Sequence, residues 1–361
     1  MEDKLTKARQ TIGEIDKQMA ELFEKRMVCV KDVAEHKMQR GLPVFDASRE
    51  EYLIKKNSEL IQNVEIRNYY IPYLQNAMDI SKRYQHKILE GMNIAYSGVE
   101  GAYAHIAAGK IFPDGNRISY PDFKSAYEAV ESGECECAVI PIENSFAGEV
   151  GQVMDLMFSG SLCVNAVYSL AIRHNLMGLK TAKIDDIKCV ISHQQALDQC
   201  APFIRNQGYK TTAMENTAMA ARQVAFTEDK SIAAIASKET AAIYGLSILK
   251  ENVNESDINT TKFAVFSRVM NEALMEQSML VFTAPHKAGS LAKAMNIIGN
   301  HGFNMKSIKS RSLKSLLWSY YFYVEIDGDL TSEKGKVMLA ELAETCDKLK
   351  VIGTYNTNCN I

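Results

Sequence analysis

The sequence lacks the patterns that identify metal sites, disulfides and membrane segments. Its eight cysteines form no CxxC pair and its seven histidines form no HExxH or HxH motif, so we expect reduced thiols and no metal. No run approaches the roughly 18 apolar residues of a membrane span. Residues 1–4 do not begin an apolar signal core. We therefore expect a cytoplasmic protein with no membrane contact.

A surplus of one charge is also absent. The net charge is −3, and lysine and arginine recur singly among acidic residues instead of forming a sustained basic stripe. A nucleic-acid partner would require such a stripe, so none is expected. Scattered cations suit pockets for small anions. The 361 residues, 47% of them hydrophobic, suffice for two or three folded domains.

The hydrophobic period changes twice along the chain, which predicts three domains over residues 1–90, 91–268 and 278–361. The first is all-α, with a long helix over residues 5–39 that contains no proline, followed by shorter helices over 46–63 and 65–87. Two short helices cannot bury the whole apolar face of the long one. We therefore expect a homodimer with intertwined helices, or a dimer of dimers.

The other two domains show mixed patterns. The middle domain is predicted to be α/β, because short β-like runs alternate with Ala-rich helices: strands 93–97, 138–142, 189–192 and 232–236, and helices 125–133 and 217–226. The last domain is predicted to be α+β. Its order is strand 279–284, helix 290–301, strands 305–312 and 317–326, helix 333–346 and strand 351–355, which is the ferredoxin-like βαββαβ order.

Cations of the long helix share a face. Arg26 and Lys37 are eleven residues apart, which at about 100° per residue leaves them about 20° apart around the helix. Arg9 is displaced by about 100° from Arg26, so we expect it to point into a different cavity, shared with a partner chain. Two further sets fall at i, i+3 and i+4 spacings, namely Asp46, Arg49 and Glu50, and Ser81 and Gln85. Taken singly, each residue could equally be a solvated surface group.

Taken together, these positions resemble the all-helical chorismate mutase family. The resemblance implies that Arg26, and Arg9 from a second subunit, grip the two carboxylates of chorismate, with Arg49 nearby. Lys37 and Gln85 would donate to the ether oxygen. Such a site suits a Claisen rearrangement, which needs no nucleophile and no proton transfer but requires a fixed conformer and stabilised charge on the breaking bond.

The same resemblance implies roles for three further residues. Asp46, Glu50 and Ser81 would hold the ring hydroxyl and neighbouring groups of the substrate.

A glycine-containing turn follows the first strand of the middle domain. Gly98 and Gly101 supply only two of the three glycines of a dinucleotide fingerprint, although Asp122 follows about 20 residues later. A nucleotide-dependent oxidoreductase acting on prephenate would need the third glycine. A turn that binds a small anion through backbone N–H groups at a helix N-terminus does not require the full three-glycine fingerprint. We expect no cofactor.

Three downstream motifs are more specific: PIENSFAGEV at 141–150, SHQQALDQC at 192–200 and NTTKF at 259–263. Together they resemble prephenate dehydratase, which implies two α/β lobes of the periplasmic-binding type that close over prephenate. The resemblance makes Thr261 the residue that assists the departing hydroxyl, as a donor or by positioning it. The other site residues that it implies are Glu143, Asn144, Ser192, Gln199, Lys262 and Phe263. Lys262 replaces an arginine of the family and lacks its bidentate fork.

Residues 284–291, 302–305 and 308–312 resemble the amino-acid-binding ACT module attached to such dehydratases. The resemblance implies that L-phenylalanine binds between paired modules, at Gly289, Ser290, Leu291, Asn304, Lys309, Ser310 and Arg311. Lys309 and Ser312 replace a glutamate and a proline of the family. Without a ligand the module would serve only for dimerisation.

The whole chain is therefore interpreted as a bifunctional enzyme of phenylalanine biosynthesis that converts chorismate to prephenate and prephenate to phenylpyruvate, under feedback inhibition by phenylalanine. A non-catalytic amino-acid sensor is the alternative of a different class, and the set Arg26, Lys37 and Gln85 argues against it.

Overall fold

The computed structural model describes residues 3–40, 44–256, 258–271, 275–312, 320–356 and 360–361. It divides into two compact units, Met1–Asn93 and Ile94–Ile361. Within these ranges no helix is both long and apolar enough to cross a membrane, and no three His, Cys, Asp or Glu residues gather as they would around a metal ion. The seven cysteines there are free thiols, while Cys359 lies outside the described residues.

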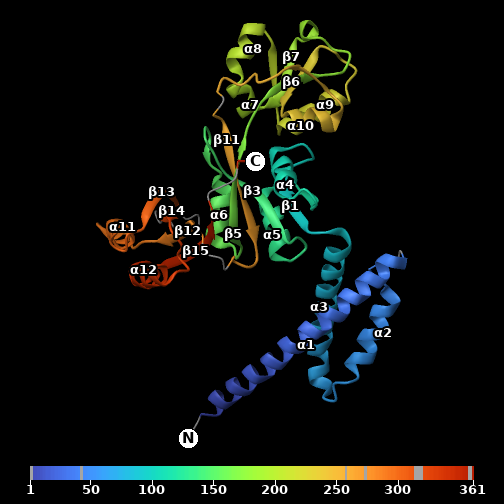
Figure 1. Cartoon of the computed structure of the whole chain (residues 1–361), viewed down its shortest axis with the longest axis vertical. Coiled ribbons are helices and arrows are strands. Elements are labelled where there is room, and N and C mark those ends of the chain that lie inside the picture. Colours follow the sequence, from blue (N-terminus) through green and yellow to red (C-terminus); the bar gives the residue numbers. More distant parts are fainter. Residues whose placement is uncertain (1–2, 41–43, 257, 272–274, 313–319, 357–359) are drawn as a thin grey trace. The chain divides into compact units, whose positions relative to one another are not determined.

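The first unit consists of three helices, as predicted: α1 (Lys4–Arg40), α2 (Ala47–Ser58) and α3 (Val64–Glu90) (Figure 1). Asp46 and Asn63 cap α2 and α3, because their side chains accept backbone N–H groups of the first turn. Both α1 and α2 pack against α3. Apolar side chains at helical spacing along the N-terminal half of α1 stay exposed within this unit, among them Ile12, Ile15, Met19 and Leu22.

The first lobe of the second unit is built on the middle of the larger sheet. It contains β1 (Asn93–Ser97), α4 (Tyr103–Ile111), β2 (Asn116–Tyr120), α5 (Phe123–Glu131), β3 (Cys137–Asn144), β4 (Gly148–Glu149), α6 (Gly151–Ser159), β5 (Cys163–Ala171) and β11 (Thr260–Ser267). Its strands follow the order β5-β11-β3-β1-β2. Strands β3 and β1 read as nearly continuous apolar runs because helices cover the sheet.

The second lobe has a sheet of its own, in the order β10-β6-β9-β7-β8. Its elements are β6 (Asn175–Gly178), β7 (Cys189–His193), α7 (Gln194–Gln199), α8 (Ala201–Gln207), β8 (Lys210–Met214), α9 (Thr217–Ala225), β9 (Ile232–Ala236), α10 (Lys238–Tyr244) and β10 (Ser247–Lys250). The chain passes between the lobes twice, from β5 to β6 and from β10 to β11. The expected two-lobed α/β architecture is confirmed.

The C-terminal region has the predicted βαββαβ order. Its elements are β12 (Gln277–Thr283), α11 (Ser290–Asn300), β13 (Asn304–Ser312), β14 (Tyr320–Asp327), α12 (Glu333–Ala343) and β15 (Lys348–Tyr355). The antiparallel order β13-β14-β12-β15 is that of a ferredoxin-like plait. The predicted strand 317–326 is observed from Tyr320, and its first three residues lie outside the described ones.

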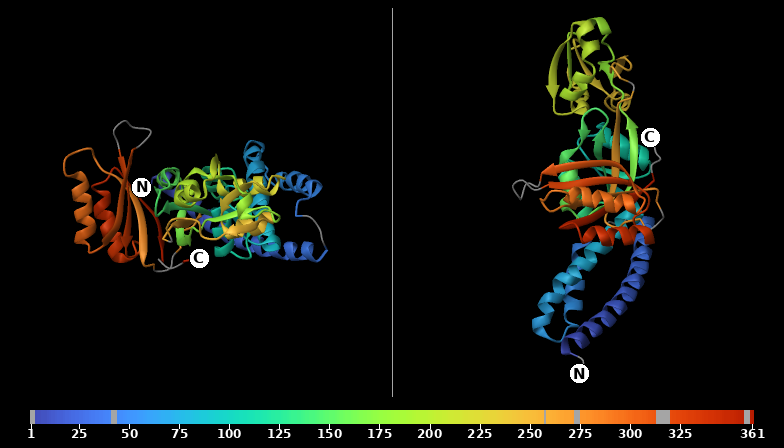
Figure 2. Two further views of the ribbon diagram at one scale, coloured as in Figure 1. Left: turned by 90° about the horizontal axis from the view of Figure 1, so that it is seen from above. Right: turned by 90° about the vertical axis from the view of Figure 1, so that its left-hand side faces the viewer.

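The C-terminal plait has a core of its own on one face and shares a second core with the first lobe on the other. Helices α11 and α12 cover one face of the plait (Figure 2). Residues of its other face, such as Val281 and Tyr323, pack with Ile140 and Phe266 of the first lobe. The two regions also join where β15 pairs with β5. These contacts fix the plait against the strands that carry the dehydratase motifs.

Candidate active sites

The three helices of the first unit enclose a cavity of about 680 Å³, here called the helical cavity. Apolar side chains such as Val30, Val33 and Met78 form part of its wall. Seven of the eight residues predicted for this unit line it: Arg26, Lys37, Asp46, Arg49, Glu50, Ser81 and Gln85. Arg9 does not line it and is exposed on the N-terminal half of α1.

Cationic groups of the helical cavity are held by neighbouring oxygens. The Arg26 guanidinium donates to the Ser81 hydroxyl, which donates in turn to the Ala77 carbonyl at 2.8 Å. Lys37 Nζ donates to the Val44 carbonyl at 2.6 Å. These contacts restrict both side chains before a substrate arrives, which reduces the entropy lost on binding.

Gln85 presents an unsatisfied atom to the same cavity. The side chain is 7% exposed, and among the described residues its Oε1 has no hydrogen-bond partner. Its Nε2 makes one long contact of 3.4 Å to the Ser81 carbonyl. A buried polar atom without a partner costs about 1–3 kcal/mol. A bound polar ligand would offset that cost.

The acidic residues of the helical cavity have partners that sequence reasoning missed. Asp46 accepts from the Ser48 hydroxyl and the Arg49 backbone, and these hydrogen bonds lower its pKa. Glu50 pairs with Lys82 at 2.9 Å, and Lys82 also pairs with Asp79. Hydrogen bonds to Asp79 and Glu50 raise the pKa of Lys82. The i, i+3 spacing of Asp79 and Lys82 in the sequence could have indicated that Lys82 forms an ion pair on this helix.

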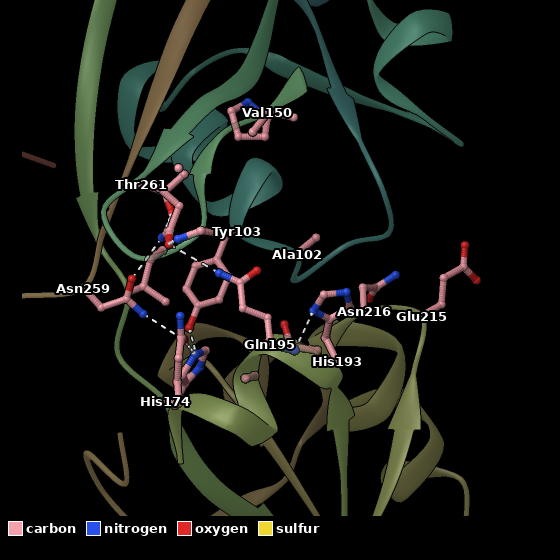
Figure 3. A pocket seen from close by; sticks show the side chains of 18 of the residues that line it. Ala102, Tyr103, Val150, His174, His193, Gln195, Glu215, Asn216, Asn259 and Thr261 are labelled. Atoms are coloured by element: carbon pink, nitrogen blue, oxygen red, sulfur yellow. Dashed lines mark hydrogen bonds between the residues drawn. The ribbon is translucent and has the colours of Figure 1, made fainter. Parts of the chain in front are cut away.

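A second cavity of about 330 Å³ lies between the two lobes of the Ile94–Ile361 unit and is here called the interlobe cleft (Figure 3). Three of its lining residues were predicted: Asn144, Gln199 and Thr261. The polar residues that sequence reasoning missed are Tyr103, Glu149, His174, His193, Gln195, Glu215, Asn216, Thr217 and Asn259. Gln195 and Asn259 lie inside recognised motifs, whereas Tyr103 and His174 carry no local signal.

Asn144 and Thr261 form the central pair of the interlobe cleft. They are cross-strand partners on β3 and β11, and Asn144 Nδ2 donates to Thr261 Oγ1 at 2.9 Å. Asn144 Oδ1 accepts backbone N–H groups of Phe146 and Ala147, both at 3.0 Å, which fixes the orientation of the amide. Because Thr261 Oγ1 accepts this bond and no described residue accepts its O–H, the hydroxyl proton is available to a ligand.

A chain of neutral polar groups extends from this pair across the cleft. Asn144 donates to Asn259, and Asn259 donates to Gln199 Oε1, each at 2.9 Å. His174 Nε2 donates to the same oxygen at 2.9 Å, and its Nδ1 lies 3.2 Å from the Tyr103 hydroxyl, which donates to the Arg173 carbonyl at 3.0 Å (Figure 3). Burial lowers the pKa of His174, and the bond to Gln199 only partly opposes this shift. His174 is therefore a neutral link between the lobes.

Four predicted site residues lie outside the cleft lining: Glu143, Ser192, Lys262 and Phe263. Side chains alternate along a strand, so Glu143 and Lys262 lie on the opposite face from Asn144 and Thr261, where they pair at 2.8 Å. Ser192 is fully buried and donates to the Ile235 carbonyl at 2.6 Å. Phe263 is 1% exposed and belongs to the core.

The interlobe cleft has no lysine or arginine among its described lining residues. Instead, three helices begin at its wall, because Ala102, Val150 and Asn216 are the N-cap residues of α4, α6 and α9. Ala102 and Val150 provide no side-chain cap, so the first N–H groups of α4 and α6 lack that partner. Helix N-termini carry partial positive charge and favour anions. The predicted anion-binding turn at Gly98 and Gly101 leads directly into α4.

The predicted effector residues lie in several parts of the C-terminal plait. Gly289 adopts a φ of +83° where α11 begins, next to Ser290 and Leu291. Ser310 is an exposed residue of β13, and Asn304 at the start of that strand donates to Asp327 at 2.8 Å.

Lys309 and Arg311, the two cations of the predicted effector set, contact the first lobe. Lys309 pairs with Glu143, and Arg311 pairs with Asp155 at 3.2 Å. Their charged groups are therefore engaged away from the start of α11.

Two family models match the chain in succession, chorismate mutase type II over residues 8–86 and prephenate dehydratase over residues 94–271. The bifunctional chorismate mutase/prephenate dehydratase of Neisseria gonorrhoeae is 33% identical, over 74% of this chain and 75% of that protein. The corresponding protein of Escherichia coli strain K12 is 28% identical, over 98% of this chain and 96% of its own length.

Solved structures agree with this result. The prephenate dehydratase from Arthrobacter aurescens, described in complex with L-Phe, superposes with a TM-score of 0.69 at 25% identity, covering 73% of this chain and 90% of that one. On these matches, the chain belongs to the family of bifunctional chorismate mutase/prephenate dehydratases.

Proposed function

We propose that the two reactions of this enzyme are divided between its two cavities. The helical cavity holds chorismate during its rearrangement to prephenate, and the interlobe cleft holds prephenate during its conversion to phenylpyruvate. The grouping of Arg26, Lys37 and Gln85 in one cavity carries the first assignment. The Asn144–Thr261 pair in the other supports the second.

The helical cavity offers what a Claisen rearrangement requires. Arg26 and Arg49 present planar guanidinium groups that fix carboxylates bidentately and so select a compact conformer of the substrate. Lys37 and Gln85 lie where they can donate to the ether oxygen as negative charge develops on it. Lys37 is held by Val44, so little reorganisation is needed at the moment of reaction.

The interlobe cleft suits a fragmentation that needs little acid strength. Prephenate loses carbon dioxide and hydroxide together, and aromatisation supplies the driving force. Thr261 donates its O–H to the departing hydroxyl, while Asn144 occupies the acceptor side of the same oxygen. The N-termini of α4 and α6 bind the carboxylates. No lysine or arginine of the described lining then competes with Thr261 as donor to the departing hydroxyl.

Lys37→Ala should abolish chorismate mutase activity while prephenate turnover continues, because the two cavities lie in different units. Loss of one preorganised donor typically costs on the order of 10²–10³ in kcat. The measurement is phenylpyruvate formation without any nucleotide, from chorismate and, separately, from prephenate. Lys31→Ala, on an exposed part of α1, is the matched control and should convert both substrates normally. A Lys37→Ala enzyme with near-normal mutase rates would contradict the assignment.

Thr261→Ala should convert chorismate only as far as prephenate, which accumulates. The mutase continues, whereas the departing hydroxyl has lost its donor. We expect a decrease of about 10²–10⁴ in the dehydratase kcat. Thr261→Ser, which keeps the hydroxyl, should retain much of the activity. The neighbouring Thr260→Ala is the control, since Thr260 bonds the Ile258 carbonyl and does not line the cleft. Wild-type rates in Thr261→Ala would refute the catalytic role.

We also propose that the enzyme is a homodimer, or a dimer of dimers, in which α1 helices of two chains pair. The exposed apolar stripe on α1 supports this, because Ile12, Ile15 and Leu22 are otherwise left 56%, 49% and 63% exposed to water. Arg9 then reaches the cavity of the partner chain and binds one substrate carboxylate.

Ile15→Glu should break this dimer and abolish mutase activity, because it places a charge in the apolar stripe. Lys17→Glu, about 160° away around the helix, should do neither. Sedimentation should give at least twice the 40.3 kDa of one chain for wild type and the control. A wild type that sediments as a monomer and is fully active as a mutase would overturn the proposal.

The C-terminal plait is proposed to bind L-phenylalanine and inhibit the enzyme. The plait has the ACT order, and the relative from Arthrobacter aurescens was solved in complex with this amino acid. With Lys309 and Arg311 engaged elsewhere, the turn at Gly289–Leu291 is the part of the predicted site that remains available.

Phenylalanine at millimolar concentration should therefore lower dehydratase activity and raise the melting temperature. Gly289→Ala should weaken both responses, because its methyl group would occupy the space beside the turn where the amino acid is proposed to bind. Gly208→Ala is the matched control, because both glycines have positive φ and open space for a Cβ, so the backbone penalty is similar. Flat activity and an unchanged melting temperature in wild type would remove phenylalanine as the effector.

A further inference from the structure

The face of the C-terminal plait that α11 and α12 leave uncovered contacts the first lobe at the end of β3, next to the interlobe cleft. Lys309 on β13 pairs with Glu143 of β3 through one carboxylate oxygen. Lys262 of β11 pairs with the other oxygen at 2.8 Å. One carboxylate thus joins three strands, two of which carry the dehydratase motifs.

These side chains form a compact set of compensating charges. Glu325 of β14 lies 3.9 Å from Lys262 and accepts from Tyr323 at 3.0 Å, so two lysines face two glutamates. The side chains of Lys309 and Glu143 are 19% and 25% exposed. Burial raises the pKa of Glu143, but hydrogen bonds from Lys262 and Lys309 outweigh it and leave the pKa lowered. Glu143 is therefore an ionised anchor.

The anchor lies directly behind the catalytic pair. In the β3–β11 ladder Glu143 is opposite Lys262, and the next rung is Asn144 opposite Thr261. Alternate side chains point to opposite faces, so the two rungs face the plait and the cleft respectively. Because their residues are consecutive along each strand, a shift of the Glu143–Lys262 rung moves the Asn144–Thr261 rung with it. On each strand, the residue that contacts the plait is therefore bonded directly to the residue that lines the cleft.

The same face also holds the other end of the segment that lines the cleft. Residues 144–150 lead from β3 into α6, and Arg311 and Tyr321 both bond Asp155 of that helix, at 3.2 and 2.9 Å. Lys350 donates to the Met157 carbonyl at 2.9 Å near the C-terminal end of α6. The segment 144–150 is thus flanked by contacts with the plait, at Glu143 before it and at Asp155 and Met157 of α6 after it.

We propose that Lys309 is a positioning residue of the dehydratase, which holds Glu143 and through it the Asn144–Thr261 pair in reactive geometry. This inference rests on the proposed role of the interlobe cleft. It assigns to Lys309 a function in the uninhibited reaction, in addition to any part in effector binding. A displacement of about 1 Å in a reacting group can cost on the order of 10² in rate.

The test uses the full chain with Lys309→Met, which keeps the aliphatic stem and removes the charge. The dehydratase kcat for prephenate should fall about 10- to 100-fold, with KM changed less, because the helix N-termini that bind substrate are not displaced. Lys309→Arg should restore kcat to within about threefold, since it keeps the charge and the reach. Mutase activity of the same preparations should be unchanged.

Lys306→Met is the matched control. Lys306 lies on the same strand, but its side chain is 42% exposed and pairs with Asp327 inside the plait. The inference is overturned if Lys309→Met matches Lys306→Met within twofold in kcat, or if Lys309→Arg is as slow as Lys309→Met, which would indicate packing alone. A wild type that does not convert prephenate would instead refute the proposed function of the cleft.

Discussion

The antiparallel pairing of β3 with β11 is the constraint on which the dehydratase half depends. Two motifs more than a hundred residues apart meet on these strands, and their register places Asn144 opposite Thr261. The two-residue alternation then divides each motif between two faces. One face presents an amide and a hydroxyl to the interlobe cleft. The other presents Glu143 and Lys262 to the C-terminal plait. Catalytic geometry and contact with the plait are therefore set by the same hydrogen-bonded ladder.

The two cavities differ in the charge of the side chains that line them. The helical cavity uses guanidinium and ammonium groups, which suits a reaction that needs positive charge next to a breaking C–O bond. The interlobe cleft has no lysine or arginine in its described lining, and the proposal assigns the binding of carboxylates to the N-termini of α4 and α6. Backbone dipoles attract carboxylates without offering a side-chain proton, and the buried His174 stays neutral. In the proposed mechanism the hydroxyl of Thr261 donates to the departing oxygen.

The C-terminal plait is joined to the first lobe by an apolar core as well as by ion pairs. Val281 and Tyr323 share a cluster with Ile140 and Phe266, so the sheet that carries Lys309 cannot move without disturbing residues near the cleft. Lys262 and Lys309, two positions at which this chain departs from the families it resembles, meet on Glu143. The two departures are therefore parts of one electrostatic arrangement.

The sequence by itself determined the order of the domains, their secondary structure and most of the helical cavity. Helix periodicity placed Arg26 with Lys37 on one helix face and Ser81 with Gln85 on another, and the resemblance to chorismate mutase assigned the two pairs to one site. The motifs likewise identified Asn144, Gln199 and Thr261. Sequence reasoning did not reveal that Glu143 and Lys262 lie outside the cleft lining, since a motif does not show which strand face meets the cleft. It also missed Tyr103 and His174, which reach the cleft from segments about 70 residues apart. Only the tertiary structure decided these positions, because strand register and the packing of the plait bring together residues that no local spacing relates.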